Sequence, residues 1–355
     1  MKKNFSKIII AGPCSAESKD QMISTAKNIE RIQEVSFFRA GLWKPRTRPN
    51  LFEGVGEKGL KWLQEVGQQT RLKTTTEVAK TIHVEKCLEY NIDALWIGAR
   101  TTVSPFSVQE IADSLKGTKK TVLVKNPVNE DLSLWMGALE RLDKAGIKKI
   151  IAIHRGFTAP PGGAYRNNPL WHIPLELKDR CPKLPIICDP SHMLGKREGL
   201  HELSQEAIDL GFDGLMIESH PNPKKALSDS KQQITPRELK NLIQNLKSNP
   251  FPSTKREKIP KSGASLESLR KLIEPLDQEL LDILQKRMEV VRQIAIFKKA
   301  KKMETFQKKR MEELIENLEI SGEKKGLGKK YIRNLYKVIH NESVNRQTEI
   351  IDILE

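Results

Sequence analysis

Residues suited to bind phosphate, carboxylate or metal ions follow eight short apolar runs in this chain. The runs are residues 7–10, 37–39, 73–76, 94–97, 121–124, 150–153, 185–188 and 214–217. Just beyond them, in chain order, stand Cys14, Lys44, Glu77, Arg100, Lys125, Arg155, His192 and Glu218. In a parallel barrel, reactive side chains gather where the strands end. A ligating or charged group after each of the runs therefore indicates an enzyme.

Four residues form a mixed donor set for a metal ion. They are Cys14, His192, Glu218 and Asp229, the last on the loop after the eighth run. Each alone has an ordinary structural explanation, such as a buried small cysteine or a turn-forming aspartate. At one barrel mouth they predict a borderline divalent ion, with Mn favoured and Fe, Co or Zn as alternatives.

Six cations also follow the runs, and one such residue alone would be read as a surface charge. Together they would repel one another unless anions bound between them, and arginine forks match phosphate and carboxylate groups. The pattern predicts two anionic substrates, one of which bears both groups. Glu77 and His154 are candidates to orient their neighbours. The six cations are Arg39, Lys44, Arg46, Arg100, Lys125 and Arg155.

The elements that must position these residues are predicted from the periodicity. Amphipathic stretches of helix length separate most of the runs, so residues 1–248 are expected to form an α/β fold, a (β/α)8 barrel. Residues 249–263 are rich in Pro, Ser and Lys and have the composition of a linker. From 264 to 355 the pattern is helical, and a small all-α domain is predicted.

Three helices are expected in this tail, one from Ala264, one near Thr305–Leu318 and one over Lys329–Leu354. Pro275 is expected to kink or weaken the first of them. One long and two shorter helices bury little core alone, so we expect this domain to pair with a second copy as an entwined dimer.

Composition limits the class of protein. The net charge of +16 over 355 residues raises nucleic-acid binding, but the lysines are scattered and many arginines follow the runs, so anionic small substrates explain the charge better. No apolar stretch is long enough for a membrane span, which needs about 18 residues. Four cysteines without paired spacing fit a reduced, cytoplasmic setting. We expect neither a nucleic acid nor a membrane as partner.

The motifs GPCS, KPRT, IGAR, VKNP, HRGF, DPSH and ESHPNP followed by ALSD resemble 3-deoxy-D-arabino-heptulosonate 7-phosphate synthase over about residues 7–240. The resemblance implies a (β/α)8 barrel that condenses phosphoenolpyruvate with erythrose 4-phosphate in the shikimate pathway. It implies metal binding by Cys14, His192, Glu218 and Asp229. Phosphoenolpyruvate would be held at its phosphate by Arg100, Lys125 and Arg155 and near its carboxylate by Arg39 and Lys44. Lys44, Pro45, Arg46 and Thr47 would bind the aldose phosphate, and Lys44, Lys125 and His192 would be catalytic.

The rival within the same fold is 3-deoxy-manno-octulosonate 8-phosphate synthase, which also uses phosphoenolpyruvate. That family typically has a KANRSS-like segment where this chain has KPRT. The KPRT segment therefore favours erythrose 4-phosphate.

The tail carries polar residues at helical spacing. Arg287 and Lys298 share one helix face, as do Ser343 and Gln347. Charge pattern alone would favour an ordinary solvated basic face.

The order of residues over about 265–350 resembles the all-helical chorismate mutase. Two chains entwine in that family, and the resemblance implies that Arg270 reaches the partner's site. Arg287, Lys298 and Gln347 would be catalytic, since Lys298 and Gln347 would hydrogen-bond the ether oxygen. Met311 stands where a glutamate is frequent in that family. The dicarboxylate would be gripped by Arg270, Arg287, Lys298 and Arg310, and Gln307 and Ser343 would line its hydroxyl side.

The fusion of two steps of one pathway predicts a bifunctional enzyme, a homodimer or homotetramer, in which chorismate or prephenate regulates the barrel. The alternative is a catalytically idle tail that senses a ligand and dimerises.

Overall fold

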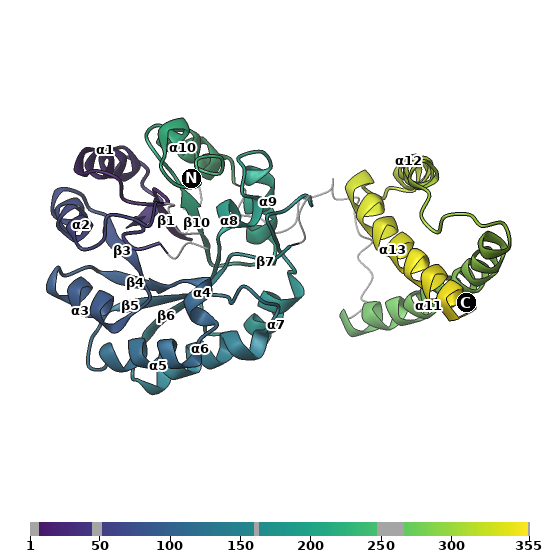
Figure 1. Cartoon of the computed structure of the whole chain (residues 1–355), viewed down its shortest axis with the longest axis horizontal. Coiled ribbons are helices and arrows are strands. Elements are labelled where there is room, and N and C mark those ends of the chain that lie inside the picture. Colours follow the sequence, from purple (N-terminus) through teal and green to yellow (C-terminus); the bar gives the residue numbers. More distant parts are fainter. Residues whose placement is uncertain (1–6, 45–51, 160–162, 247–265, 354–355) are drawn as a thin grey trace. The chain divides into compact units, whose positions relative to one another are not determined.

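Eight parallel strands close into a barrel, which confirms the predicted fold class (Figure 1). Around the barrel their order is β1, β10, β9, β6, β5, β4, β3, β2. The register places Gly12 of β1 opposite Glu218 of β10, so these two strands end at the same level. The strands are β1 (Ile8–Gly12), β2 (Val35–Arg39), β3 (Lys73–Val78), β4 (Ala94–Ile97), β5 (Thr121–Lys125), β6 (Lys149–His154), β9 (Ile186–Cys188) and β10 (Gly214–Glu218).

The structure is a computed structural model that describes residues 7–44, 52–159, 163–246 and 266–353. It divides into two units, Met1–Thr254 and Lys255–Glu355. The first is the barrel unit and the second is the helical unit, and each is described by itself.

Alternation along the strands builds two apolar layers in the barrel unit. Ile10, Trp96 and Leu123 are fully buried inside the barrel. Ile9 and Ala11, on either side of Ile10, belong instead to the larger cluster between the strands and the helices. Successive side chains of a strand point to opposite faces, so each strand contributes to both layers. The barrel interior is therefore packed, and polar side chains can gather only beyond the strand ends.

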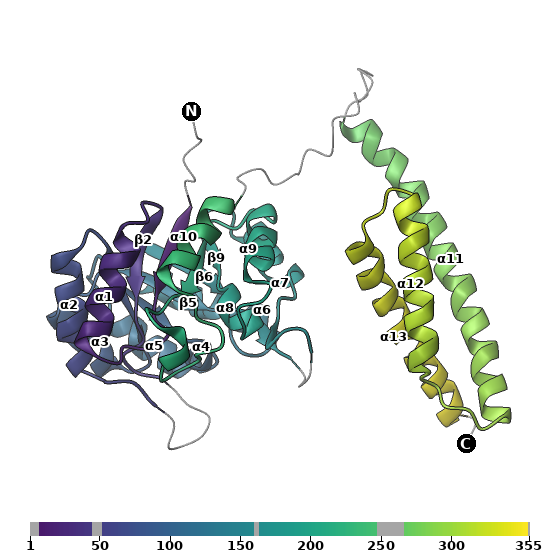
Figure 2. The ribbon, with the colours of Figure 1, turned by 90° about the horizontal axis from the view of Figure 1, so that it is seen from above.

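Helices follow the strands and cover the outside of the barrel, as both views show (Figures 1 and 2). Several begin with a side-chain cap, since Ser18, Ser104, Asp131 and Thr235 each accept a hydrogen bond from a backbone N–H in the first turn. The helices around the barrel are α1 (Lys19–Glu30), α2 (Lys58–Gln69), α3 (Thr81–Glu89), α5 (Pro105–Ser114), α6 (Leu132–Lys144), α7 (His172–Arg180), α9 (Leu200–Asp209) and α10 (Pro236–Asn245).

Short helices and a hairpin follow the C-terminal ends of several strands. A hairpin of β7 (Phe157–Thr158) and β8 (Asn167–Asn168) follows β6. The helices α4 (Ala99–Thr102) and α8 (Pro190–Leu194) follow β4 and β9, and a 3-10 turn η1 (Pro223–Lys225) follows β10. The sequence pattern did not predict these elements, which shape the barrel mouth.

The helical unit consists of α11 (Leu266–Ala300), α12 (Lys308–Lys324) and α13 (Lys329–Ile353). Helix α11 continues through Pro275, so the proline does not end it. Helix α12 runs past Leu318, where the sequence predicted its end. It includes Gly322, and a side chain there would meet Ile332 of α13. Glycine allows the close approach of the two helices, which the periodicity could not show.

Candidate functional site

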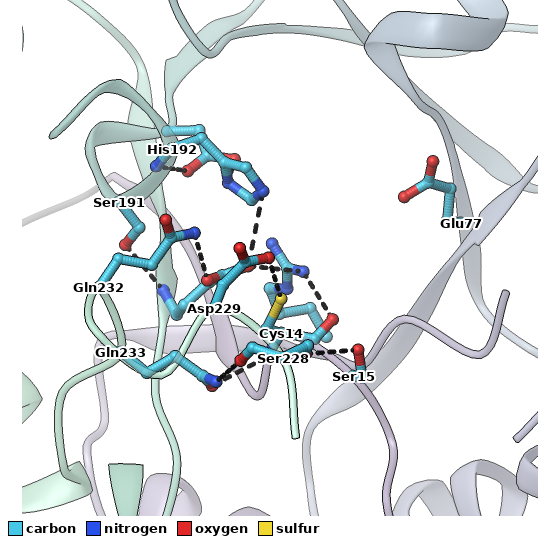
Figure 3. A network of polar contacts seen from close by, with 12 residues as sticks. Cys14, Ser15, Glu77, Ser191, His192, Ser228, Asp229, Gln232 and Gln233 are labelled. Atoms are coloured by element: carbon cyan, nitrogen blue, oxygen red, sulfur yellow. Dashed lines mark hydrogen bonds and ion pairs between the residues drawn. The ribbon is translucent and has the colours of Figure 1, made fainter. Parts of the chain in front are cut away.

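The four candidate metal donors lie at the C-terminal mouth of the barrel, and Figure 3 labels three of them, Cys14, His192 and Asp229. Cys14 Sγ lies 3.1 Å from Asp229 Oδ2, and His192 Nε2 lies 3.6 Å from Glu218 Oε1. Cys14 and Glu218 are fully buried. Gly12 makes this geometry feasible, because it has φ +150° and a side chain at this position would collide with the carbonyl oxygen of Arg39. The segments that follow β1 and β10, together with α8, thus bring together residues that are far apart in the sequence, such as Cys14 and Asp229 at 215 positions.

The ammonium of Lys44 contacts two of these donors. Its Nζ lies 2.6 Å from Asp229 Oδ2 and also contacts Cys14 Sγ. In this conformation, no three His, Cys, Asp or Glu side chains among the described residues are placed around one point as ligands of an ion. The donor set nevertheless fits a divalent ion in its chemistry, and buried Glu218 Oε1 accepts no hydrogen bond from the described residues.

Burial and neighbouring charges set the protonation states of the candidate donors. Burial raises the pKa of the Cys14 thiol well above its ordinary value, and the Glu218 charge adds to this effect. Burial would also raise the pKa of Asp229, but the Lys44 ammonium holds it well below the ordinary value. Burial lowers the pKa of His192, and Asp189 opposes that shift. The imidazole is therefore favoured in its neutral form, which can ligate a metal.

Arg39 is a buried cation with unused donors. Its guanidinium lies 4.8 Å from the centre of the Trp96 ring, and Nη2 contacts both Glu218 Oε1 and the carbonyl oxygen of Cys14 at 3.3 Å. Nε and Nη1 are buried and have no hydrogen-bond partner among the described residues. Because buried donors are normally satisfied, these two groups point to a bound anion.

Lys125 and Arg155 are two further buried cations, and hydrogen bonds to polar side chains hold each of them. Lys125 Nζ donates to Asp189 Oδ2 at 2.9 Å. Arg155 Nη1 donates to Asn167 Oδ1 at 2.6 Å, and its backbone N–H donates to Asn126 Oδ1 at 2.7 Å. Burial lowers the pKa of Arg155 to about 10, so the guanidinium remains charged at neutral pH. Both cations are available to an anion at the mouth.

The remaining predicted residues have different placements. Arg100 lies exposed on α4. Glu77 accepts a hydrogen bond from Trp96 Nε1 at 3.1 Å and lies apart from the donor cluster (Figure 3). The His154 ring is enclosed by Trp135, Phe157, Trp171 and Phe212, so it belongs to the packing outside the barrel. Pro45, Arg46 and Thr47 lie outside the described residues.

Several polar residues at the mouth were not singled out from the sequence. Asp189 contacts both Lys125 and His192, with its Oδ2 2.8 Å from His192 Nδ1. Asn126 and Asn167 hold Arg155, and Gln232 and Gln233 contact the donor residues. A visible signal existed for four of them, because Asn126 and Asp189 stand within the motifs VKNP and DPSH, and Gln232 and Gln233 follow ALSD closely.

A cavity of about 690 Å³ lies elsewhere in the barrel unit. It is lined by residues at the N-terminal starts of strands, such as Thr121, Lys149 and Pro185. None of the predicted site residues lines it, so the candidate active site rests on the geometry of the opposite end.

In the helical unit, the structure brings together part of the second predicted site. Arg287 Nη1 contacts Ser343 Oγ, and Gln347 Nε2 donates to the carbonyl oxygen of Ser343 at 3.0 Å. Gln347 Oε1 is buried and has no hydrogen-bond partner among the described residues. Lys298 Nζ donates to the carbonyl oxygen of Thr305 at 2.6 Å, and burial lowers the pKa of Lys298.

The structure describes the side chains of two of the other three predicted residues of the helical unit. Arg310 is exposed and lies 3.8 Å from Glu313. Gln307 is exposed at the start of α12. Arg270 lies on α11, and its side chain is outside the described part of the structure.

A parallel eight-stranded barrel with candidate metal donors and buried cations at its mouth is typical of an enzyme that acts on anionic substrates. The sequence model of the DAHP synthetase I family matches residues 3–249, and that of chorismate mutase type II matches residues 269–348. The chain belongs to the DAHP synthetase I family, and its C-terminal part is a chorismate mutase domain. It is therefore an enzyme with a transferase domain and an isomerase domain.

Relatives and solved structures agree with this assignment. The phospho-2-dehydro-3-deoxyheptonate aldolase of Thermotoga maritima is 35% identical over 239 residues, which cover 67% of this chain and 68% of that protein. Its crystal structure matches with a TM-score of 0.60 at 34% identity over 68% of each chain. The structure of a truncated form of the 3-deoxy-D-arabino-heptulosonate 7-phosphate synthase of that organism matches with a TM-score of 0.59 at 31% identity. The match covers 68% of this chain and 85% of that chain.

Proteins named as 2-dehydro-3-deoxyphosphooctonate aldolases are also similar to this chain, at lower identity. The 2-dehydro-3-deoxyphosphooctonate aldolase of Campylobacter jejuni subsp. doylei is 28% identical over 271 residues, covering 67% of this chain and 96% of that protein. Among the described residues, no helix is both long and apolar enough to span a membrane.

Proposed function

We propose that the barrel unit condenses phosphoenolpyruvate with erythrose 4-phosphate and that the helical unit converts chorismate to prephenate. The observation that carries the first activity is the close placement of four candidate metal donors and buried cations at one barrel mouth. The domain assignments support both reactions.

The barrel reaction is proposed to depend on a divalent metal ion held by Cys14, His192, Glu218 and Asp229. A thiolate, an imidazole and two carboxylates suit Mn²⁺, with Fe²⁺, Co²⁺ or Zn²⁺ as alternatives. When bound, such an ion acts as a Lewis acid toward the aldehyde of the aldose phosphate. Because burial keeps the pKa of the Cys14 thiol high, binding should release a proton from it.

The buried cations are proposed to bind phosphoenolpyruvate. Arg39 offers Nε and Nη1 to its carboxylate, and both donors are buried and without a hydrogen-bond partner among the described residues. Lys125 and Arg155 offer charge to its phosphate, and Asp189 and Asn167 fix their positions. Arg100, exposed on α4, would complete the phosphate site, and Lys44 would lie between the carboxylate and the aldose phosphate.

The chemistry follows from the groups that these residues hold. C3 of phosphoenolpyruvate forms a bond with the aldehyde carbon, and the aldehyde oxygen takes up a proton. Water adds at C2, and the C2–O bond to phosphate breaks, so that inorganic phosphate leaves with its bridging oxygen. Preorganised cations stabilise the charge carried by the phosphate and carboxylate throughout.

The metal assignment is tested by replacing Cys14 with Ala. The chelated wild-type protein should lose condensation activity and regain it with Mn²⁺, whereas chelated Cys14→Ala should stay inactive on addition of the ion. The surface variant Lys116→Ala should behave as wild type. Full activity of Cys14→Ala after chelation would contradict the assignment.

For the helical unit, Arg287, Lys298, Ser343 and Gln347 are proposed to surround the dicarboxylate. Lys298 and Gln347 would stabilise the charge that grows on the ether oxygen in the transition state. Arg270, Gln307 and Arg310 would complete the site, with Arg270 reaching the site of a second copy. An idle regulatory module is the alternative, because Met311 replaces a frequent glutamate.

The two readings of the helical unit are separated by the chorismate mutase activity of the intact protein. Prephenate formation in wild type that Arg287→Ala abolishes would establish catalysis. The absence of any conversion by wild type would favour the idle module. The exposed variant Arg292→Ala serves as a matched control.

We further propose a homodimer or homotetramer, located in the cytoplasm, in which prephenate or chorismate regulates the barrel. Exposed apolar residues on the helical unit support a second copy, since a free surface of this kind is unfavourable in water. All four cysteines are unpaired, which fits a reducing location. Slower phosphoenolpyruvate consumption by the intact protein in the presence of prephenate would support the regulation.

A further inference from the structure

The side chains of two consecutive glutamines on the loop between β10 and α10 contact two of the four proposed metal donors, Glu218 and Cys14. Gln232 and Gln233 are 1% and 0% exposed, although glutamine is mostly a surface residue. Their side chains contact different strand ends, Gln232 the end of β10 and Gln233 the segment after β1 (Figure 3). Buried amides of this kind require partners for both the oxygen and the nitrogen.

Gln232 is oriented by two charged partners of opposite sign. Its Nε2 donates to Glu218 Oε2 at 2.7 Å, and its Oε1 accepts from Arg166 Nη1 at 2.9 Å. A carboxylate can only accept and a guanidinium can only donate, so only one orientation of the amide is satisfied. Glu218 Oε2 thereby has a hydrogen-bond partner, whereas Oε1 accepts no hydrogen bond from the described residues and lies 3.3 Å from Arg39 Nη2 and 3.6 Å from His192 Nε2.

Gln233 makes the corresponding connection on the other side. Its Oε1 accepts from the backbone N–H of Cys14 at 2.9 Å, and its Nε2 donates to the carbonyl oxygen of Ser228 at 2.8 Å. Ser228 precedes Asp229, which has a left-handed φ of +44° that is uncommon outside glycine. The hydrogen bonds of Gln233 therefore fix Cys14 relative to the strained backbone that presents Asp229.

We propose that Gln232 and Gln233 are positioning residues that orient Glu218 and the backbone segments that carry Cys14 and Asp229 for metal binding. This inference rests on the proposed metal-dependent function of the barrel. Only an amide offers a donor and an acceptor at this reach. Glutamate in place of Gln232 would face Glu218 with a like charge, and an apolar side chain would leave buried partners unsatisfied. Groups that orient metal ligands typically change metal affinity by about 10–100-fold.

The test compares metal binding by Gln232→Met and Gln233→Met with that of wild type, in the intact protein. Methionine keeps a similar length and removes both hydrogen bonds. Mn²⁺ affinity is measured by competition with a chelator, and Co²⁺ absorption in the thiolate charge-transfer region reports the Cys14 bond. We expect affinity to fall about 10–100-fold in each variant and activity to recover at high metal concentration.

The matched control is Gln109→Met on α5. Gln109 Nε2 also donates to a carboxylate, that of Asp113 at 3.1 Å, but on the outer surface of the barrel. The metal affinity of the Gln109→Met protein should equal that of wild type. If Gln232→Met does not fold, Gln232→Asn provides the test, because it keeps the amide and shortens its reach.

Wild-type affinity in both folded glutamine variants would overturn the inference while leaving the proposed function intact. Failure of wild type itself to bind any divalent ion, or binding unchanged in Cys14→Ala, would instead overturn the proposed metal site. Weakened binding in the variants together with a lost Co²⁺–thiolate band in Gln233→Met would support the positioning role.

Discussion

At the scale of single residues, the barrel mouth joins buried cations to buried acceptors. Lys125 and His192 share Asp189, and Lys44 contacts Cys14 and Asp229. Removal of one member leaves an uncompensated buried charge, which costs more than the pair contributes. Substitutions here should therefore affect folding as well as activity, and binding measurements must accompany rates.

The sequence singled out most of the charged residues of the mouth, but neither Asp189 nor the amides that contact them. Cys14 and His192 could be found because each follows an apolar run. Gln233 could not, because its importance arises from a hydrogen bond to Cys14, which is 219 positions away. His154 was proposed to orient neighbours, and the structure places it among aromatic rings instead. The sequence does not show to which side of the barrel wall a side chain at the end of a strand points, because this depends on the local backbone conformation.

His154 should make the stability of the barrel unit depend on pH. Burial lowers its pKa to about 3, and its Nε2 lies 2.5 Å from the carbonyl oxygen of Pro169. The folded state keeps the ring neutral, whereas the unfolded chain takes up a proton near pH 6.5. Stability from this residue is thus complete above pH 6.5 and is lost as the pH falls toward 3. Between pH 7 and 5 the loss should be about 2 kcal/mol.

The variant His154→Phe should reduce this pH dependence by about the same amount. Tryptophan fluorescence during urea unfolding is a suitable measurement, since all five tryptophans lie in the barrel unit. His172→Phe, at the start of α7, is the control. An unchanged difference in stability between pH 7 and 5 in His154→Phe would show that the histidine is not the responsible group.

At the scale of elements, the barrel strands were predictable because most of them are short buried apolar runs with a clear end, although β3 is rich in threonine. The hairpin β7–β8 was not, because two residues per strand carry no periodicity. The end of α12 was also wrong by six residues, from Leu318 to Lys324, since Gly322 serves helix packing and does not end the helix.

A substitution of Gly12 tests how closely the backbones of β1 and β2 must approach each other at the mouth. Gly12→Ala places a methyl group against the carbonyl oxygen of Arg39 at an unfavourable φ. We expect a loss of about 2–4 kcal/mol in the stability of the barrel unit, read by tryptophan fluorescence. Gly117→Ala also has a positive φ, but its methyl group meets nothing within 4 Å, so a loss of only about 1 kcal/mol is expected. Equal losses in both variants would contradict a close contact at Gly12.

At the scale of the whole molecule, the two units differ in how much apolar surface they bury. Among the described residues of the helical unit, the buried apolar side chains are Val291, Ala295, Ile315 and Ile332. Leu276, Leu280 and Ile283 on one face of α11 are 61%, 50% and 60% exposed. The sequence predicted this shortage of core from the number of helices, but it could not show which side chains remain exposed.

The exposed face of α11 should be covered by a second copy. Leu280→Asp would bury a charge in that contact, so the intact protein should shift toward monomer at micromolar concentration. Sedimentation velocity measures the shift, and Gln285→Asp adds the same charge at an exposed polar position. Wild-type association of Leu280→Asp would show that this face lies outside the contact.

The most direct test of the central claim is the initial rate of phosphoenolpyruvate loss with Mn²⁺ and either erythrose 4-phosphate or a five-carbon aldose phosphate. We predict rapid consumption with erythrose 4-phosphate, release of inorganic phosphate in equal amount, and slow or absent consumption with the longer sugar. Consumption that requires the five-carbon sugar, or no consumption with any divalent ion, would contradict the account.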